Sequence, residues 1–196
     1  LLALFDKQSF LQHTVDRIKP IVPLNNIFVI TNQAQATAVR KQLPHLPKDN
    51  VVAEPCGRDT CPAVALAAAL VGARSTTGTM AILPADHVIP EKSVKKFQRN
   101  LEESFDLAER GQAIITSGIK PTSPETGYGY IKRGENEGNG FIIEKFKEKP
   151  SPQLAKEYFK SGEYFWNSGI FLFRASRYLE ELKKFRPDIY KACEVS

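Results

Sequence analysis

The hydrophobic positions of this chain follow two spacings, one typical of amphipathic helices and one typical of short buried strands. In the first 120 residues the two kinds of segment alternate. The helical segments are 9–18, 33–43, 60–73 and 93–110, and the strand segments are 26–31, 51–53, 79–83 and 113–117. Pro44 ends the second helix and Gly111 the fourth, because neither residue continues a helix well. This alternation predicts an α/β protein with a mostly parallel sheet and helices on both of its faces.

The second half of the chain has a different pattern. Strands are predicted over 127–133 and 141–146, and the polar, glycine-rich segment 134–140 between them is predicted to be a hairpin loop. No helix follows these glycines, so they do not indicate a phosphate-binding loop. The remaining predicted elements are a helix over 152–160, a strand over 169–173 and a helix over 176–185.

Composition and charge narrow the class of protein only moderately. With 196 residues, 42% hydrophobic and 25% charged, the chain fits one large globular domain or part of a larger one. A formal charge of +5 without a long basic run does not indicate a nucleic-acid surface, and no apolar run is long enough to span a membrane. The apolar start lacks the basic flank of a signal peptide. Three cysteines without metal-ligand spacing are typical of a reducing compartment, so we expect a cytoplasmic protein that binds neither nucleic acid nor membranes.

The most informative segment is 79–87, an apolar run that ends at Pro84 and is followed at once by Asp86. In open α/β sheets, ligands bind just past the carboxyl ends of such strands. A carboxylate at that point is well placed to hold a divalent ion against phosphate oxygens. The alternative is that Asp86 only forms a turn or caps a helix.

The segment 53–63 follows one predicted strand and opens the next helix. The carboxylate of Glu54 can accept two parallel hydrogen bonds, which matches the two adjacent donors of guanine, and Arg58 can pair with a phosphate. The alternative for Glu54 is a solvated loop residue. Asp59 and Thr60 are expected to cap the helix whatever the function is.

Three further segments carry polar side chains beside predicted strands. Tyr128 and Gly129 lie at a strand entrance, where glycine lets the backbone approach a ligand, although a bend in an edge strand would use the same residues. Glu148 and Lys149 can hold sugar hydroxyls and a phosphate together, but composition alone favours a charged strand end. Asn167 can hydrogen-bond to hydroxyls, or it can serve a turn.

Taken together, these motifs resemble one family along nearly the whole chain. The matching segments, which keep the order and spacing of the family, are 54–58, 83–87, 125–131, 148–150 and 166–169. They are similar to the catalytic domain of the mannose-1-phosphate guanylyltransferases, or GDP-mannose pyrophosphorylases, which are sugar nucleotidyltransferases. The resemblance implies a Rossmann-like α/β/α nucleotidyltransferase (GT-A-like) fold. It also implies the Mg²⁺-dependent transfer of GMP from GTP to mannose 1-phosphate, by in-line attack and without a covalent intermediate.

The resemblance also assigns roles to individual residues. It implies that Asp86 is the catalytic residue that binds the metal. The residues assigned to the nucleotide are Glu54, Arg58, Thr60 and Pro84, and those assigned to the sugar phosphate are Tyr128, Gly129, Glu148, Lys149 and Asn167. Residues 1–120 are accordingly expected to form the nucleotide-binding part of the domain and residues 121–196 the sugar-binding part.

The chain departs from the family pattern in several places. The glycine-rich loop that precedes the first helix of the family is absent, and no second metal-binding aspartate is found before Ser196. Asp59 and Cys61 stand where the family usually has asparagine and alanine. We therefore expect a catalytic domain incomplete at both ends, and the activity is expected of the intact parent enzyme. The alternatives are another sugar-1-phosphate nucleotidyltransferase and a non-catalytic regulatory module with this fold; self-association into a homo-oligomer stays open.

Overall fold

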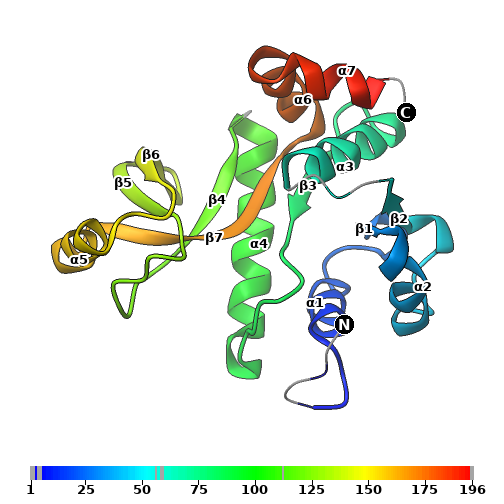
Figure 1. Cartoon of the computed structure of the whole chain (residues 1–196), viewed down its shortest axis with the longest axis horizontal. Coiled ribbons are helices and arrows are strands. Elements are labelled where there is room, and N and C mark those ends of the chain that lie inside the picture. Colours follow the sequence, from blue (N-terminus) through cyan, green and yellow to red (C-terminus); the bar gives the residue numbers. More distant parts are fainter. Residues whose placement is uncertain (1–2, 4–5, 56, 58–59, 112, 195–196) are drawn as a thin grey trace. The chain divides into compact units, whose positions relative to one another are not determined.

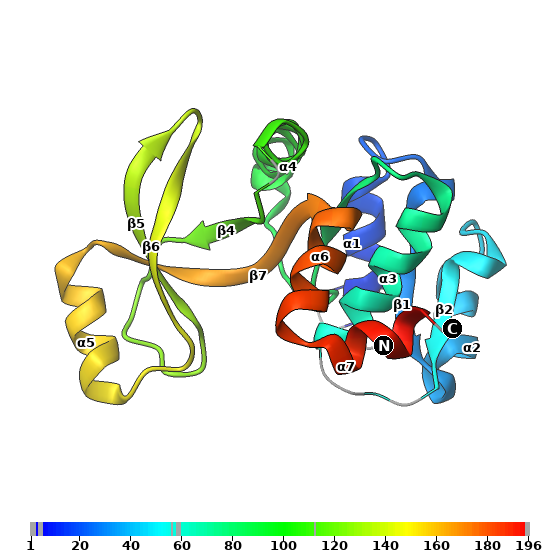
Figure 2. The same cartoon turned by 90° about the horizontal axis from the view of Figure 1, so that it is seen from above.

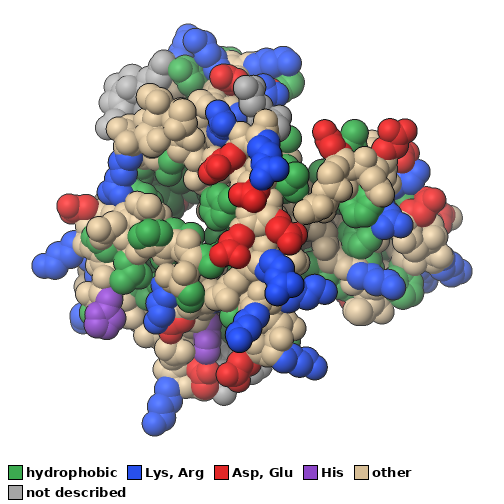
Figure 3. Space-filling model, turned by 180° about the vertical axis from the view of Figure 1, so that it is seen from behind, with side chains coloured by type: hydrophobic (Ala, Val, Ile, Leu, Met, Phe, Trp, Pro, Cys, Tyr) green, Lys and Arg blue, Asp and Glu red, His purple; other side chains and the backbone are tan. Residues whose placement is uncertain are grey.

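The computed structural model describes residues 3, 6–55, 57, 60–111 and 113–194, and Figure 1 shows the order of their elements. The chain falls into two compact units. Unit 1 comprises Leu1–Ile114 and Leu172–Ser196, and unit 2 comprises Ile115–Phe171. None of the helices in the described part of the chain has the length and apolar character that crossing a lipid bilayer requires. On the face shown in Figure 3, acidic and basic side chains are mixed and do not form a patch of one sign.

Unit 1 contains the alternating helices and strands that the sequence predicts. Its helices are α1 (Phe10–Ile18), α2 (Gln33–Gln42), α3 (Thr60–Arg74), α4 (Glu91–Gly111), α6 (Ala175–Phe185) and α7 (Pro187–Glu194), with short 3₁₀ turns at Leu24–Asn26 and Lys48–Asn50. Its strands are β1 (Val29–Asn32), β2 (Val51–Glu54) and β3 (Thr79–Ile82). Strands β1 and β2 are parallel, with Val29 opposite Val51. Helix α2 packs against both of them, and α3 and α4 contact β3.

Local chemistry explains where two of these helices form. Ser9 caps α1 by accepting from the Gln12 N–H, and the Gln12 side chain accepts in return from the Ser9 N–H. This reciprocal pair satisfies two backbone donors that a helix start otherwise leaves open. In α3, Ala65 and Ala68 are completely buried, and their small side chains allow the close packing that the alanine-rich sequence predicts.

A buried asparagine holds together the connections around β2. Asn50 is 1% exposed, and its Nδ2 donates to the carbonyls of Asn25 (2.9 Å) and Ile27 (2.8 Å). Its Oδ1 accepts from Arg74 at the end of α3 (3.2 Å), and the Arg74 guanidinium lies 4.3 Å from the centre of the Phe28 ring. Asn50 thus satisfies backbone carbonyls that no strand partner reaches, which a buried site requires.

Unit 2 is built on a hairpin and one helix. Its elements are β4 (Ile115–Ile119), β5 (Tyr130–Glu137), β6 (Gly140–Lys147), α5 (Pro152–Ser161) and the first part of β7 (Tyr164–Arg174). Strand β5 pairs antiparallel with β6 and with β7, and β4 also pairs with β7. Figure 2 shows β5 and β6 as a long two-stranded hairpin. Strand β7 continues into unit 1, and β3 is its neighbour in the sheet.

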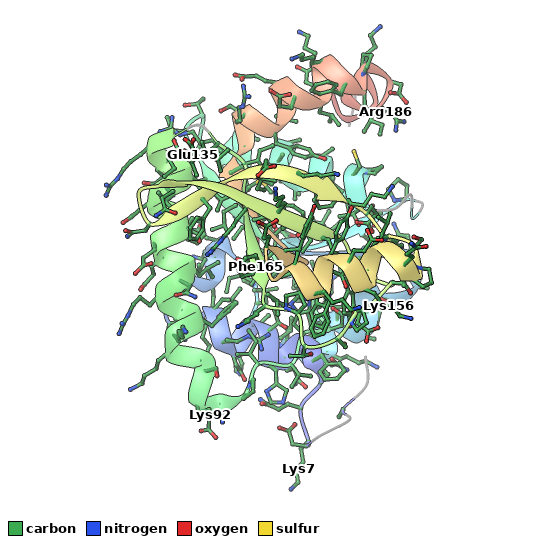
Figure 4. The ribbon with its side chains drawn as sticks, turned by 90° about the vertical axis from the view of Figure 1, so that its left-hand side faces the viewer. Lys7, Lys92, Glu135, Lys156, Phe165 and Arg186 are labelled. Carbon is green, nitrogen blue, oxygen red and sulfur yellow. The ribbon has the colours of Figure 1, made fainter. Side chains whose placement is uncertain are left out.

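Aromatic residues form the core of unit 2. Tyr130 and Ala155 are completely buried and Tyr158 is 8% exposed. The rings of Tyr158 and Tyr164 stack with their centres 3.9 Å apart, and Trp166 packs on the same cluster. In Figure 4, Phe165 marks β7 and Lys156 marks α5, the two elements that contribute most of this cluster. The core fixes β7 against α5 and thereby places the residues of β7 that follow Trp166.

Several predicted boundaries are wrong. The predicted loop over 134–140 is largely strand, because β5 runs to Glu137 and β6 begins at Gly140. Gly138, with φ of 57°, makes the tight turn instead. The strand predicted over 127–133 begins at Tyr130, the strand predicted over 113–117 lies at Ile115–Ile119, and the strand predicted to begin at Gly169 begins at Tyr164. Helix α7 was not predicted. The predicted division between residues 120 and 121 concerns which substrate each part binds, and it stays a prediction. The two compact units are defined by packing and have other boundaries.

Candidate functional site

Three residues assigned to the sugar meet at one point in unit 2. Gly129 lies just before β5, Glu148 just after β6, and Asn167 within β7. The Asn167 N–H donates to the Gly129 carbonyl (2.7 Å). A Cβ atom added to Gly129 would lie 2.6 Å from Glu148 Oε2 and 3.4 Å from Asn167 Cβ. Only glycine therefore leaves room for this carboxylate beside the amide, and the fold brings together residues that lie up to 38 positions apart in the sequence.

Tyr128 extends this cluster on the side of Trp166. The Tyr128 side chain is 50% exposed, and its ring meets the Trp166 ring edge-on with the centres 5.1 Å apart. A hydrogen bond from the buried Tyr130 anchors the segment before β5, because the Tyr130 hydroxyl donates to the Glu125 carbonyl (2.9 Å). Trp166 Nε1 is buried and has no hydrogen-bond partner among the residues described. The cluster thus combines an open aromatic ring with a carboxylate and an amide.

Lys149 has an unusual backbone conformation. Its φ of 41° lies in the left-handed region, although it is not glycine and precedes Pro150. A left-handed conformation at such a residue costs on the order of 1 kcal/mol or more, and a following proline restricts the backbone further. Its Nζ lies 4.0 Å from Glu148 Oε1, and both side chains are exposed. The chain bend at Lys149 thus carries a carboxylate and an ammonium side by side on the surface of unit 2.

The amide of Asn167 is held by two hydrogen-bond donors. Its Oδ1 accepts from Thr116 Oγ1 (2.9 Å) and from the Gly169 N–H (3.2 Å). Thr116 lies on β4 and was not among the residues that the sequence singled out. No local signal could have found it, because its partner is 51 positions away. Asn167 lies inside β7 and not before the strand predicted to begin at Gly169, and its bond to the Gly169 N–H, two residues on, is the local contact that the turn alternative expects.

The residues assigned to the nucleotide belong to unit 1. Glu54 is the last residue of β2 and is half-buried, and Thr60 is the exposed first residue of α3. Pro84 is half-buried two residues after β3, and Asp86 is exposed in the turn that follows. Asp86 thus lies past the carboxyl end of a strand, as its sequence position predicts. Arg58 lies outside the described residues.

A buried arginine supports the segment that carries Asp86. Arg17 on α1 is 6% exposed; it donates to Thr14 Oγ1 (2.9 Å) and, over a longer distance, to the His87 carbonyl (3.4 Å). Burial lowers the pKa of the Arg17 guanidinium from its ordinary value. Sequence reasoning missed Arg17, because an arginine on a predicted amphipathic helix is normally an exposed residue.

A divalent metal would have to be held by few protein ligands. In the described ranges, no three His, Cys, Asp or Glu side chains gather in a way that could hold a metal ion. Magnesium commonly takes only one or two carboxylates and completes its octahedron with phosphate oxygens and water. The exposed carboxylate of Asp86 can serve as such a ligand, whereas the described residues offer no site made of protein ligands alone.

Comparison with known proteins identifies the family. A model of the nucleotidyl transferase family matches residues 1–196, and the chain belongs to this family. The fold class predicted from the resemblance is thereby confirmed. The chain is also similar to a crystal structure of a mannose-1-phosphate geranyltransferase from Thermus thermophilus, with a TM-score of 0.85 and 32% identity over 97% of this chain and 55% of that chain. A crystal structure described as a mannose-6-phosphate isomerase from Helicobacter pylori has a TM-score of 0.82 and 30% identity over 98% of this chain and 72% of that chain.

The names of the curated relatives specify an activity more closely than the family model does. The chain is 44% identical over 198 residues to the mannose-1-phosphate guanylyltransferase RfbM of Salmonella typhimurium (strain LT2), a match that covers 98% of this chain. It is 45% identical over 195 residues to the mannose-1-phosphate guanylyltransferase of Escherichia coli (strain K12), which covers 95% of this chain. The chain spans about 40% of the length of each of these relatives. The predicted resemblance to this family is confirmed.

Proposed function

We propose that the intact protein carrying this chain transfers GMP from GTP to mannose 1-phosphate, giving GDP-mannose and pyrophosphate. The observation that carries the proposal is the meeting of Gly129, Glu148 and Asn167 at one point, in a chain of the nucleotidyl transferase family. The names of the curated relatives support the choice of GTP and mannose 1-phosphate among the substrates of that family.

On the sugar side, the cluster offers complementary groups. The Glu148 carboxylate accepts hydrogen bonds from sugar hydroxyls, and the Asn167 amide supplies a donor. Lys149 brings a positive charge next to this carboxylate, which suits the phosphate of the same substrate. The exposed ring of Tyr128 offers an apolar surface to the sugar.

On the nucleotide side, Glu54 accepts the two adjacent N–H donors of guanine, while Arg58, Thr60 and Pro84 contact the rest of the nucleotide. Asp86 holds Mg²⁺, which when bound neutralises the charge of the phosphate oxygens. A phosphate oxygen of mannose 1-phosphate attacks the α-phosphorus of GTP in line. The bond from the α-phosphorus to the bridging oxygen breaks, and pyrophosphate leaves with the electron pair. The chain's own residues contribute mainly by positioning the reactants.

A substrate panel tests the proposal. The intact protein is given GTP, ATP, UTP or dTTP with mannose, glucose or fucose 1-phosphate, and pyrophosphate release and the nucleotide sugar are measured. We expect the highest kcat/KM for GTP with mannose 1-phosphate. A higher value for another pair identifies a different sugar-1-phosphate nucleotidyltransferase, and no product from any pair indicates a non-catalytic module.

A pair of variants tests the sugar side in the same assay. Glu148→Gln removes the carboxylate of the cluster, whereas Glu144→Gln removes an exposed carboxylate of β6 that is paired with Lys132 (2.9 Å). Only the first variant is expected to raise the KM for mannose 1-phosphate. Equal KM values for the two variants would contradict the assignment of Glu148 to the sugar.

A further inference from the structure

One backbone N–H shows which end of the Asn167 amide is the oxygen. Gly169 directs its N–H at one end of this amide (3.2 Å), and a backbone N–H can only donate. The atom that faces it must therefore be the oxygen and not the nitrogen, so the usual ambiguity of an asparagine amide is removed at this position. Gly169 itself has φ of 73°, in the left-handed region that favours glycine, which holds this N–H in place.

Thr116 occupies the other side of the same oxygen. Its Oγ1 lies 2.9 Å from Asn167 Oδ1 and 2.9 Å from the Ile170 carbonyl oxygen. Both neighbours are acceptors and the hydroxyl has one proton, so Thr116 donates to one of them at a time or shares the proton between the two. With Thr116 and Gly169 bound to Oδ1, the amide nitrogen Nδ2 is turned away from both.

The Asn167 Nδ2 group is therefore the part of this side chain that remains available. It has no hydrogen-bond partner within the described part of unit 2, and it is not among the buried atoms that lack a partner. Glu148, which can only accept when ionised, approaches the same point beside Gly129. The cluster thus presents a donor on Asn167 and an acceptor on Glu148 beside the same glycine, and one hydroxyl can bind to both.

We propose that Thr116 is a positioning residue that keeps the Asn167 amide turned with its NH₂ group toward the sugar. The sugar hydroxyl bound there accepts from Asn167 Nδ2 and donates to Glu148. This inference rests on the proposed function and adds to it the direction of each hydrogen bond. The other role open to Thr116 is purely structural, because its contact with the Ile170 carbonyl also ties β4 to β7.

Steady-state kinetics of two Thr116 variants of the intact protein distinguish the positioning role from the structural role. Thr116→Val keeps the shape of the side chain and removes the hydroxyl, and Thr116→Ser keeps the hydroxyl as a matched control. We expect Thr116→Val to raise the KM for mannose 1-phosphate about 5- to 20-fold, the usual effect of losing one orienting hydrogen bond, with the KM for GTP unchanged. Thr116→Ser should stay within about twofold of the unmodified protein.

A double-mutant cycle supplies the readout that a structural role does not move. In an Asn167→Ala background, Thr116→Val should add less than about twofold to the KM for mannose 1-phosphate, because the amide that it orients is gone. The same fold-change in both backgrounds would overturn the inference, and so would a normal KM for Thr116→Val alone. An intact protein that makes no nucleotide sugar at all would instead refute the proposed function.

A second variant covers the case in which Thr116→Val does not fold. Asn167→Asp keeps an oxygen for Thr116 and Gly169 but replaces the NH₂ donor with a second acceptor. It should raise the KM for mannose 1-phosphate at least about tenfold, since two carboxylates then face one hydroxyl. A normal KM for Asn167→Asp would overturn the inference independently of Thr116.

Discussion

The most direct test of the site geometry is the substitution Gly129→Ala. The added Cβ would lie 2.6 Å from Glu148 Oε2 and 3.1 Å from Phe146 Cζ. Ordinary contacts between such atoms begin at about 3.5 Å, so the carboxylate oxygen must retreat by roughly 0.9 Å. Because this oxygen is the far end of an exposed, flexible side chain, the protein can yield without unfolding, and we expect a loss of stability of no more than about 1 kcal/mol.

The functional cost should be much larger than the structural one. A displacement of about 1 Å in a positioning group can cost up to about a hundredfold in rate, which corresponds to about 2.7 kcal/mol. We expect Gly129→Ala to lower kcat/KM for mannose 1-phosphate by about 10- to 100-fold while leaving the KM for GTP within about twofold. Steady-state assays of pyrophosphate release with each substrate varied in turn measure both constants.

Gly127→Ala is the matched control for this experiment. It lies two residues earlier, and a Cβ there would meet nothing within 4 Å. It should therefore behave like the unmodified protein in kinetics and in thermal unfolding. If the two alanine variants had the same kcat/KM for mannose 1-phosphate, the Glu148 carboxylate would not be needed where the structure places it, and the assignment of the cluster to the sugar would be refuted.

Three further predictions concern unit 1. Asp86→Asn should lower turnover by at least about a thousandfold, since a charge-neutralising metal contributes several kcal/mol, and near-normal Mg²⁺-dependent pyrophosphate release would exclude the metal role. Glu54→Gln should weaken the preference for GTP over ATP, because one acceptor becomes a donor; a competition assay with an unchanged ratio would move base recognition elsewhere. Asn50→Ala should cost about 1 to 3 kcal/mol in urea unfolding, because the buried Ile27 carbonyl loses its donor, whereas the Asn25 carbonyl keeps Arg74 Nη1 (2.9 Å). A loss below about 0.5 kcal/mol would show that water replaces the amide.

Among the helices of the described residues, all except α7 were predicted, because their signals are local. Ser9 opens α1 through a cap within three residues, and Pro152 at the start of α5 fits a helix whose first N–H has no partner in any case. Strand ends depend on distant partners. Residues 164–168 contain turn-forming residues, yet they form β7 because Trp166 pairs with Tyr130, far away in the sequence. Likewise, the polar residues at the tip of the β5–β6 hairpin are exposed and show no hydrophobic alternation, so only their pairing makes them strand.

The candidate site was predictable residue by residue but not as an arrangement. Gly129, Glu148 and Asn167 stand in the short motifs on which the family resemblance rests. Their common point cannot be read from the sequence, since it depends on the register of β5 with β6 and β7. Arg58 lies outside the described residues, and its role stays a prediction.

The residues that the sequence missed share a physical feature. Thr116 and Arg17 are both donors that bind an oxygen of a residue distant in the sequence, Asn167 Oδ1 in one case and the His87 carbonyl in the other. Neither residue stands in a motif that the sequence singled out. A donor that binds an oxygen of another residue restricts the orientation of that residue. Its effect on a ligand is therefore exerted through the second residue and not through contacts of its own. Further positioning residues are therefore expected among the side chains that donate to Asn167 or to the segment after Asp86. Their residue types alone do not indicate such a role.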